Sequence, residues 1–177
     1  AERKLPINPA DPTCGKLHKG KPAPTTTFYV VGDGGALGDV FVSLSGISGK
    51  FTGASASPVL VDQVACVYTP YVTAAQTGQK INVKNSDPFL HNVHCTPKVA
   101  GNKERNLAQP FKGKVDTFSF PKAEEFLRFK CDVHPWMFAY INIVDHPYFD
   151  VTGKDGSFTI KNVPDGSYTL RVKHRKL

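Results

Sequence analysis

The chain has 177 residues, of which 40% are hydrophobic and 21% charged, a balance typical of a folded globular protein and not of a disordered one. Its net charge of +7 comes from scattered lysine and arginine residues, without the aromatic-interleaved basic motif of a nucleic-acid-binding protein. We therefore expect no nucleic-acid partner, and either a solvated basic surface or docking to an acidic protein. No apolar stretch approaches the roughly 20 residues of a membrane span, so none is expected.

The composition favours an all-β fold, because Val, Phe, Tyr and Thr are abundant while 15 glycines and 14 prolines supply turns. Residues 1–25 are rich in Pro, Lys and Asn and lack periodicity, which predicts an extended arm. Strands are expected at 25–31 and 39–46, the second because its apolar and polar residues alternate. We assign residues 26–57 to an appended small β-sandwich.

Residues 58–145 are expected to form one domain that contains most of the strands. Its strands are predicted in 58–87 and at 90–95, 117–120, 126–131 and 137–144, with a long loop over 96–114. Residues 146–177 alternate around turns at Gly153–Gly156 and Pro164–Gly166, which predicts a hairpin-rich unit completing the appended sandwich. No helix longer than a turn or two is predicted.

The stretch CDVHPWM at 131–137 places a thiol, an imidazole and a thioether close together, at Cys131, His134 and Met137. A disulfide would use only Cys131, and a nucleophilic cysteine would take His134 as its base, although such pairs usually come from distant segments. A metal site would use all three side chains. Zinc gains nothing from the thioether, whereas copper gains a long axial ligand. We therefore favour copper, with zinc as the main alternative.

A copper site of this kind needs a second imidazole from another strand, because three ligands on one tight loop cannot surround an ion. HNVH at 91–94 lies in a predicted strand and is the candidate. His91 and His94 have opposite parity along a strand, so only one of them is expected to face the site.

The stretches NSDPFLHNVH and CDVHPWM resemble those of the cupredoxins, and specifically the amicyanin-type ligand loop C-x2-H-x2-M, over roughly residues 58–145. The resemblance implies a Greek-key β-sandwich that holds one copper ion per chain. It implies that the ligands are His91, Cys131, His134 and Met137, and it leaves His94 outside the site.

A wider resemblance covers nearly all of the chain. With the two stretches above, DPTCGKLHKG, VDQVACVYTPYV and TGKDGSFTIKNVPDGSYTLRVKH resemble a bacterial family labelled methylamine-utilisation or plastocyanin-like. Its members join a cupredoxin to a carboxypeptidase-regulatory-like β-sandwich. This sequence departs from that pattern at Tyr71, where a histidine is expected, and at Cys95, where a small residue is usual.

Residues beside the ligands are expected to tune the metal. The resemblance implies that the backbone N–H of Asn92 points at the Cys131 sulfur while its side chain ties the two ligand loops together. Asp132 would accept hydrogen bonds from the loop backbone or from Asn92, and its charge would lower the reduction potential. Val133 stands where amicyanin-type loops have proline, so its N–H could donate to the thiolate and raise the potential. Pro135 matches a family proline.

The resemblance implies an electron carrier and not an enzyme, with alternatives of a copper-dependent redox enzyme or a structural, surface-assembly protein. Electrons would pass through the edge of His134, in an apolar patch that includes Trp136. The partner would be a c-type cytochrome or a copper/quinoprotein oxidoreductase. With Cys131 reserved for copper, the other three cysteines allow one disulfide, and family-like positions favour Cys14–Cys66. A disulfide and copper favour the periplasm or the cell surface, with a signal peptide removed before Ala1.

Overall fold

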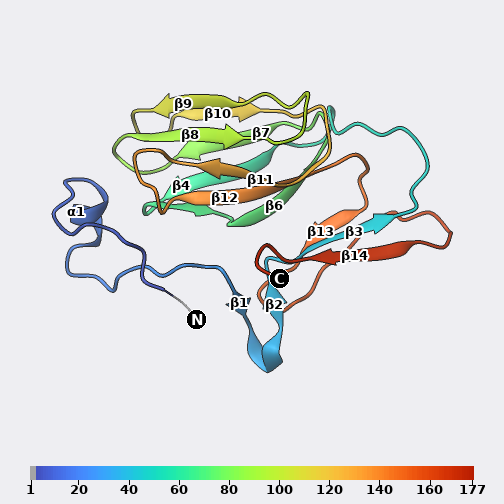
Figure 1. The fold of residues 1–177 in the computed structure, drawn as a ribbon, viewed down its shortest axis with the longest axis horizontal. Helices are drawn as coiled ribbons and strands as arrows, with labels where there is room; N and C mark the ends of the chain where they lie inside the picture. Colours follow the sequence, from blue (N-terminus) through green and yellow to red (C-terminus); the bar gives the residue numbers. More distant parts are fainter. Residues whose placement is uncertain (1–2) are drawn as a thin grey trace.

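A computed structural model of the chain describes residues 3–177, and these form an almost entirely β structure (Figure 1). Within the described residues the helical segments are short, namely α1 (Cys14–His18) and the 3-10 turn η1 (Asp33–Gly35). Neither has the length and hydrophobicity needed to cross a bilayer. The all-β prediction is confirmed.

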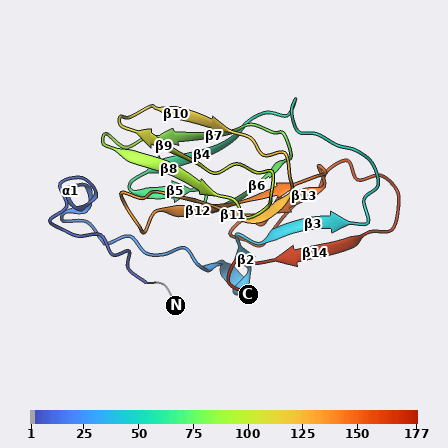
Figure 2. The same ribbon diagram turned by 45° about the horizontal axis from the view of Figure 1, so that its top comes forward.

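Two sheets form the main body of the molecule, and they overlap in the views of Figures 1 and 2. The first has the order β10 (Val115–Phe118), β7 (Ile81–Asn85), β4 (Val59–Val64) and β5 (Val67–Thr69). The second has the order β6 (Val72–Gln76), β12 (Phe138–Val144), β11 (Glu124–Lys130), β8 (His91–Thr96) and β9 (Arg105–Gln109). Neighbours are often distant in sequence, and β4–β7 and β6–β12 pair in parallel, so the chain crosses repeatedly between the sheets as in a Greek-key sandwich.

The core lies between these two sheets. In β7, Ile81 and Val83 are fully buried while the alternate positions are partly exposed, which is the strand period expected from the sequence. Phe118 and Phe129 meet edge to face across the core, with ring centroids 5.2 Å apart. Such packing of large apolar side chains supplies most of the driving force for folding.

The predicted loop over 96–114 contains a strand that the sequence pattern did not reveal. β9 pairs antiparallel with β8, with His91 opposite Gln109 and Cys95 opposite Arg105. Its residues RNLAQ lack alternation because β9 is the outer strand of its sheet and most of its side chains are exposed. This strand is therefore recognised by its pairing with β8 and not by a pattern of alternating apolar residues.

Strands from the two ends of the chain combine in a smaller three-stranded sheet. β3 (Phe41–Ser45) lies between β13 (Phe149–Val151) and β14 (Thr169–Lys173), antiparallel to both, while β1 (Val30–Val31) and β2 (Leu37–Gly38) form a separate ribbon. Residues 157–168 form no strand, so the hairpin expected there is not seen. Phe158 is 42% exposed and this segment has no partner strand, which explains the difference.

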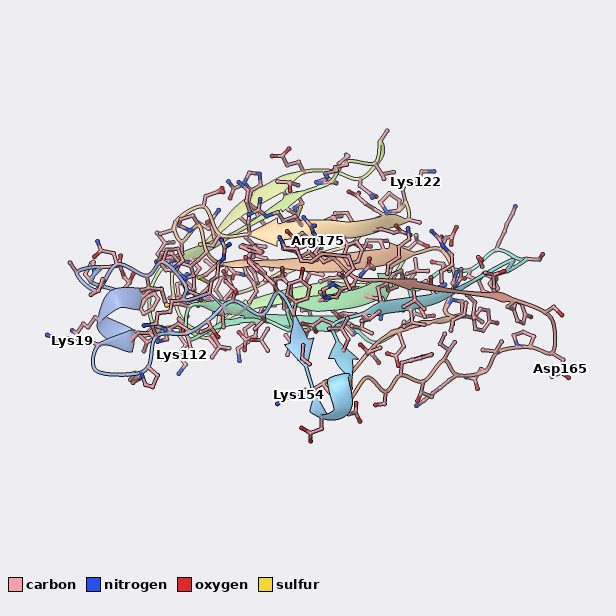
Figure 3. All side chains as sticks on the ribbon, turned by 60° about the horizontal axis from the view of Figure 1, so that its bottom comes forward. Lys19, Lys112, Lys122, Lys154, Asp165 and Arg175 are labelled. Carbon is pink, nitrogen blue, oxygen red and sulfur yellow. A yellow bond between two sulfur atoms is a disulfide. The ribbon has the colours of Figure 1, made fainter. Side chains whose placement is uncertain are left out.

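Residues 3–25 run along one end of the sandwich, where α1 lies (Figures 1 and 2). Lys19 on this segment and Lys112 in the loop between β9 and β10 project at the same end of the molecule (Figure 3). We call residues 3–25 the arm. It contains α1 and carries Cys14, which is bonded to Cys66. The predicted disulfide is therefore confirmed.

Candidate metal centre

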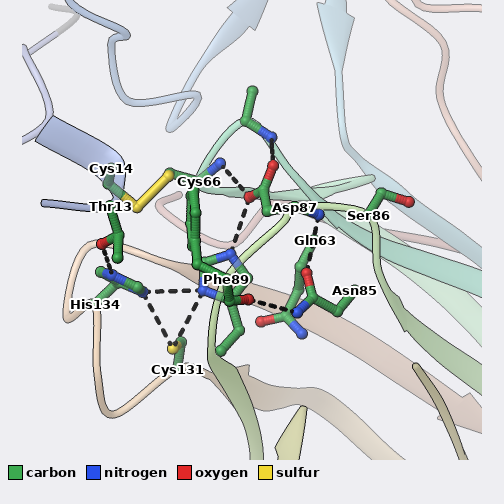
Figure 4. A network of polar contacts seen from close by, with 12 residues as sticks. Thr13, Cys14, Gln63, Cys66, Asn85, Ser86, Asp87, Phe89, Cys131 and His134 are labelled. Atoms are coloured by element: carbon green, nitrogen blue, oxygen red, sulfur yellow. Dashed lines mark hydrogen bonds and ion pairs between the residues drawn. A yellow bond between two sulfur atoms is a disulfide. The ribbon is translucent and has the colours of Figure 1, made fainter. Parts of the chain in front are cut away.

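Three predicted ligands converge at the end of the sandwich beside the arm (Figure 4). His91 begins β8, and Cys131 directly follows β11. These strands are antiparallel neighbours, so the start of one meets the end of the other. The Cys131 sulfur lies 4.0 Å from Nδ1 of His91 and 3.7 Å from Nδ1 of His134, and the two Nδ1 atoms are 2.9 Å apart.

The loop between β11 and β12 is folded back on itself by its own backbone. The N–H of Cys131 donates to the carbonyl of Met137 at 3.0 Å, and the N–H of Met137 donates to the carbonyl of His134 at 2.9 Å. These bonds return Met137 to the side of Cys131, and both residues belong to the core. His91, Cys131, His134 and Met137 are only 0%, 1%, 2% and 1% exposed.

Each imidazole is oriented by a hydrogen bond on its outer nitrogen. Nε2 of His91 lies 2.9 Å from a carboxylate oxygen of Asp87. Nε2 of His134 lies 3.3 Å from the hydroxyl of Thr13, which itself donates to the carboxylate of Asp11 at 2.6 Å. Acceptors on both Nε2 atoms place the ring protons there, so each Nδ1 presents a lone pair toward Cys131.

The thiol of Cys131 is poised to ionise. Burial alone would raise its pKa, but contacts with the His134 and His91 rings, and the backbone N–H groups of Asn92 and His134, outweigh burial and lower the pKa to about 6. Burial likewise opposes a charged His91, yet its contacts with Asp87 and Cys131 raise the pKa of the imidazole. At neutral pH the site therefore favours a thiolate, which is the metal-binding form.

These residues fit the copper ion that the resemblance implies. A soft thiolate and two imidazole lone pairs converge in a buried pocket, and a buried thioether lies on the same loop. That mixture of donors suits copper in both of its common oxidation states better than it suits zinc.

Asn92 joins the two ligand segments, as predicted. Its backbone N–H points at the Cys131 sulfur at 3.5 Å. Its side-chain oxygen accepts from the backbone N–H of Asp132 at 2.6 Å and, more weakly, from that of Val133 at 3.4 Å. The N–H of Val133 is thus directed at Asn92 and not at the thiolate, and the second backbone group that stabilises the thiolate belongs to His134.

Asp132 is the centre of an exposed polar cluster beside the site. Its carboxylate contacts Lys130 at 2.6 Å, His94 at 2.7 Å and the side chain of Asn106 at 2.9 Å. A weaker contact with the Asn92 amide, at 3.3 Å, confirms the expected link between them. The outer nitrogen of His94 contacts Glu104 at 2.6 Å, so His94 faces away from the ligands, as its strand parity predicted.

The surface expected around His134 differs from the prediction. We expected the imidazole edge to reach solvent, but only 2% of His134 is exposed because the arm lies over it with Thr13. Trp136 is partly buried, packs against His134 with ring centroids 5.3 Å apart, and donates its indole N–H to the carbonyl of Cys66 at 3.1 Å. Pro135 is exposed beside them.

Sequence reasoning missed Thr13 and Asp87, the acceptors on the two imidazoles. Asp87 lies four residues before His91 in SDPFLH, and its proximity to a candidate ligand was the signal available. Thr13 lies 121 residues from His134, and no local pattern connects them. Cys95 is a buried free thiol whose sulfur lies 3.7 Å from the carbonyl of Lys103. Tyr71 packs in an aromatic cluster with Phe28, Phe138 and Tyr140.

Comparison with known proteins gives partial similarities. No curated protein matches the chain. A family model for the beta-sandwich domain of ER membrane protein complex subunit 7 matches residues 132–177. Solved structures that are similar to part of the chain include cupredoxins.

Three of these structures illustrate the extent of the similarity. The copper-containing nitrite reductase of Thermus scotoductus SA-01 is 22% identical with a TM-score of 0.45 over 51% of this chain, which spans only 23% of the reductase. An oxidised amicyanin variant is 18% identical with a TM-score of 0.44, over 58% of this chain and 97% of its own. A purple cupredoxin from Nitrosopumilus maritimus is 18% identical with a TM-score of 0.39, over 48% of this chain and 98% of the cupredoxin.

Proposed function

We propose that the protein binds one copper ion per chain through His91, Cys131, His134 and Met137 and carries single electrons between redox partners. The observation that supports this proposal is the convergence of two imidazole lone pairs on a buried sulfur whose thiolate form is stabilised. When bound, copper supplies one-electron chemistry by cycling between Cu(I) and Cu(II).

The protein groups around the site keep the ligands in place and exclude water. Asp87 and Thr13 hold the two imidazoles, and Asn92 ties the two ligand segments together. Ligands held in this way rearrange little when the charge on the metal changes, which suits rapid electron transfer. Met137 as fourth ligand closes the position that a substrate would need, so a carrier is favoured over an enzyme.

The setting of this function is also a proposal. A disulfide and a copper thiolate suit the periplasm or the cell surface. The charge of +7 suits an acidic docking face on a redox partner such as a c-type cytochrome or a copper/quinoprotein oxidoreductase. Residues 58–145 would form the copper domain, and 26–57 with 146–177 the appended unit.

One observation favours the rival proposal of a redox enzyme. A cavity of about 360 Å³ is lined by Phe28, Tyr71, Trp136 and Phe138 among others, and it adjoins the candidate metal centre through Trp136, which packs against His134. An aromatic cavity of this size could hold a small organic substrate. The two functions differ in whether the protein turns over without a protein partner.

Voltammetry of the copper-loaded protein on an electrode separates the two functions. A carrier gives one reversible one-electron wave that small molecules leave unchanged, and Cys131→Ala removes the wave. A catalytic current on adding nitrite, dioxygen or a phenol would establish an enzyme and overturn the carrier proposal.

A further inference from the structure

The candidate copper centre has no exposed ligand through which an ion could first be captured. All four proposed ligands are 2% exposed or less. The arm covers the imidazole of His134 through Thr13, and Cys14 and Cys66 are themselves fully buried. A metal site needs a path by which the ion arrives. In the disulfide-bonded protein, the arm blocks access to His134 from solvent.

A second set of metal-binding groups lies directly outside the first. Cys14, Asp11 and His134 place their ligand atoms within 4.8 Å of one another, and Cys66, Asp87 and His91 do the same. The two cysteines are bonded to each other, so these two groups form one cluster, and Figure 4 shows this disulfide between His134 and Asp87. The outer Nε2 atoms of both imidazoles face this cluster, while their Nδ1 atoms face Cys131.

The chemistry of this outer cluster depends on the state of its sulfurs. Thiolates are strong ligands for soft ions and select Cu(I), whereas the sulfurs of a disulfide have no thiolate to offer. The α-carbons of Cys14 and Cys66 are 5.9 Å apart, so two thiols at these positions can reach one shared ion. The cluster is therefore a soft-metal site only when the disulfide is reduced.

The disulfide is the covalent link between this part of the arm and the sandwich. Around it, Leu17 of α1 packs against the core, Thr13 contacts His134, and the His18 ring contacts the carbonyl of Ala65 at 3.0 Å. α1 itself has only five residues, too few to be stable alone. Breaking the disulfide would therefore loosen the arm over His134.

We propose that Cys14 and Cys66, in their dithiol form, make a Cu(I)-acquisition site that passes the ion to the inner centre, after which disulfide formation locks the arm. This proposal rests on the proposed copper function. Closure joins the two sulfurs and releases two protons and two electrons, which a disulfide oxidant takes up by thiol–disulfide exchange. Opening requires a dithiol reductant that returns them.

A Cu(I) titration in the Cys131→Ala background isolates the outer site. The protein competes with the chromogenic chelator bicinchoninate under anaerobic conditions, after reduction by a dithiol and its removal, or without reduction. We expect one Cu(I) per reduced chain and at least tenfold weaker binding to the oxidised chain. Adding Cys14→Ser and Cys66→Ser to this background leaves Cys95 as the remaining thiol. Reduction should then no longer increase the affinity for Cu(I). Equal Cu(I) binding by reduced and oxidised protein would overturn the proposal.

Loading of the wild-type apoprotein tests the passage inward. Reduced protein should acquire Cu(I) at least tenfold faster than oxidised protein, and Cys14→Ser/Cys66→Ser should load more slowly than the reduced wild type. If the double variant loads as fast, an open arm suffices and the thiol site is refuted. If it does not fold, as judged by circular dichroism, the Cu(I) titration of reduced and oxidised Cys131→Ala decides, because it measures binding by the two thiols and not access to the inner centre. Oxidation of the loaded protein to Cu(II) with hexacyanoferrate(III), followed by measurement of the Cys131 thiolate band, reports on the inner centre independently.

Discussion

Asp132 is the charged residue that is best placed to influence the proposed copper centre. It follows the thiolate directly, and hydrogen bonds from Lys130, with further help from His94 and Asn92, hold its pKa well below the usual range. Its carboxylate is therefore ionised at neutral pH. Val133 does not counteract the effect of Asp132 on the reduction potential, because its N–H donates to the side-chain oxygen of Asn92 and not to the Cys131 sulfur.

Replacing Asp132 by Asn should raise the reduction potential. Removing a negative charge beside the metal disfavours Cu(II), by on the order of tens of millivolts for a partly solvated charge a few ångströms away. Voltammetry of the copper-loaded variant measures the shift. Glu104→Gln is the matched control, because Glu104 also contacts His94 but lies one residue further from the ligands in this network. A fall in potential for Asp132→Asn would contradict this account of the cluster.

Asp39 carries a stability cost that depends on pH. Burial raises the pKa of its carboxyl to about 6, above the value of 3.8 for an ordinary aspartate. Between these values the folded state holds the proton more tightly than the unfolded state, so ionisation of Asp39 lowers stability as pH rises through this window. The cost is complete above pH 6 and absent below about pH 4.

Asp39→Asn should remove this cost. Asparagine also tolerates the left-handed backbone at this position, where φ is 59°. We expect the variant to be more stable than wild type by about 1 kcal/mol at pH 7, after allowance for partial exposure of the carboxyl. The advantage should vanish near pH 4, as measured by urea unfolding at both pH values. An advantage of the same size at both would show that charge is not its cause.

At the level of elements, the sequence predicted the strands that alternate and missed those defined by pairing. β7 and β8 follow the period of two, and the parity of β8 correctly separated His91 from His94. β9 was missed because it lies at a sheet edge and carries few apolar side chains. The sequence does not reveal that the arm covers His134, because the contact joins Thr13 and His134, which are 121 positions apart.

The disulfide between the arm and the start of β5 should be a large contributor to stability. It joins residues 52 positions apart, and by chain-entropy arguments closing a loop of this length stabilises the folded state by up to about 4 kcal/mol. Urea unfolding of the apoprotein with and without a dithiol measures the effect. We expect reduction to lower the free energy of unfolding by roughly 2–4 kcal/mol. A change below the error of the measurement would mean that the arm is held by other contacts.

The molecule combines a two-sheet β-sandwich with a smaller three-stranded sheet, and its charged side chains are spread over the surface. Basic side chains such as Lys19, Lys122 and Lys154 lie at different edges of the molecule (Figure 3), and the net charge is +7. A charge of this size steers small ions as well as proteins. Because salt screens such attraction over about 10 Å at 0.1 M, the effect is measurable through ionic strength.

Electron exchange with small charged complexes should show this steering. Oxidation of the Cu(I) protein by an anionic complex such as hexacyanoferrate(III) should slow as salt is added, whereas oxidation by a cationic complex should become faster. Stopped-flow absorbance gives both rate constants. Salt dependences of the same sign for both complexes would indicate that the net charge does not govern approach to the centre.

The central claim is that His91, Cys131, His134 and Met137 hold a copper ion through a thiolate. Metal analysis combined with an absorption spectrum after loading with copper tests it most directly. We predict one copper per chain and an intense thiolate band near roughly 600 nm that disappears on reduction and is absent from Cys131→Ala. A colourless protein that retains zinc after copper reconstitution would contradict it.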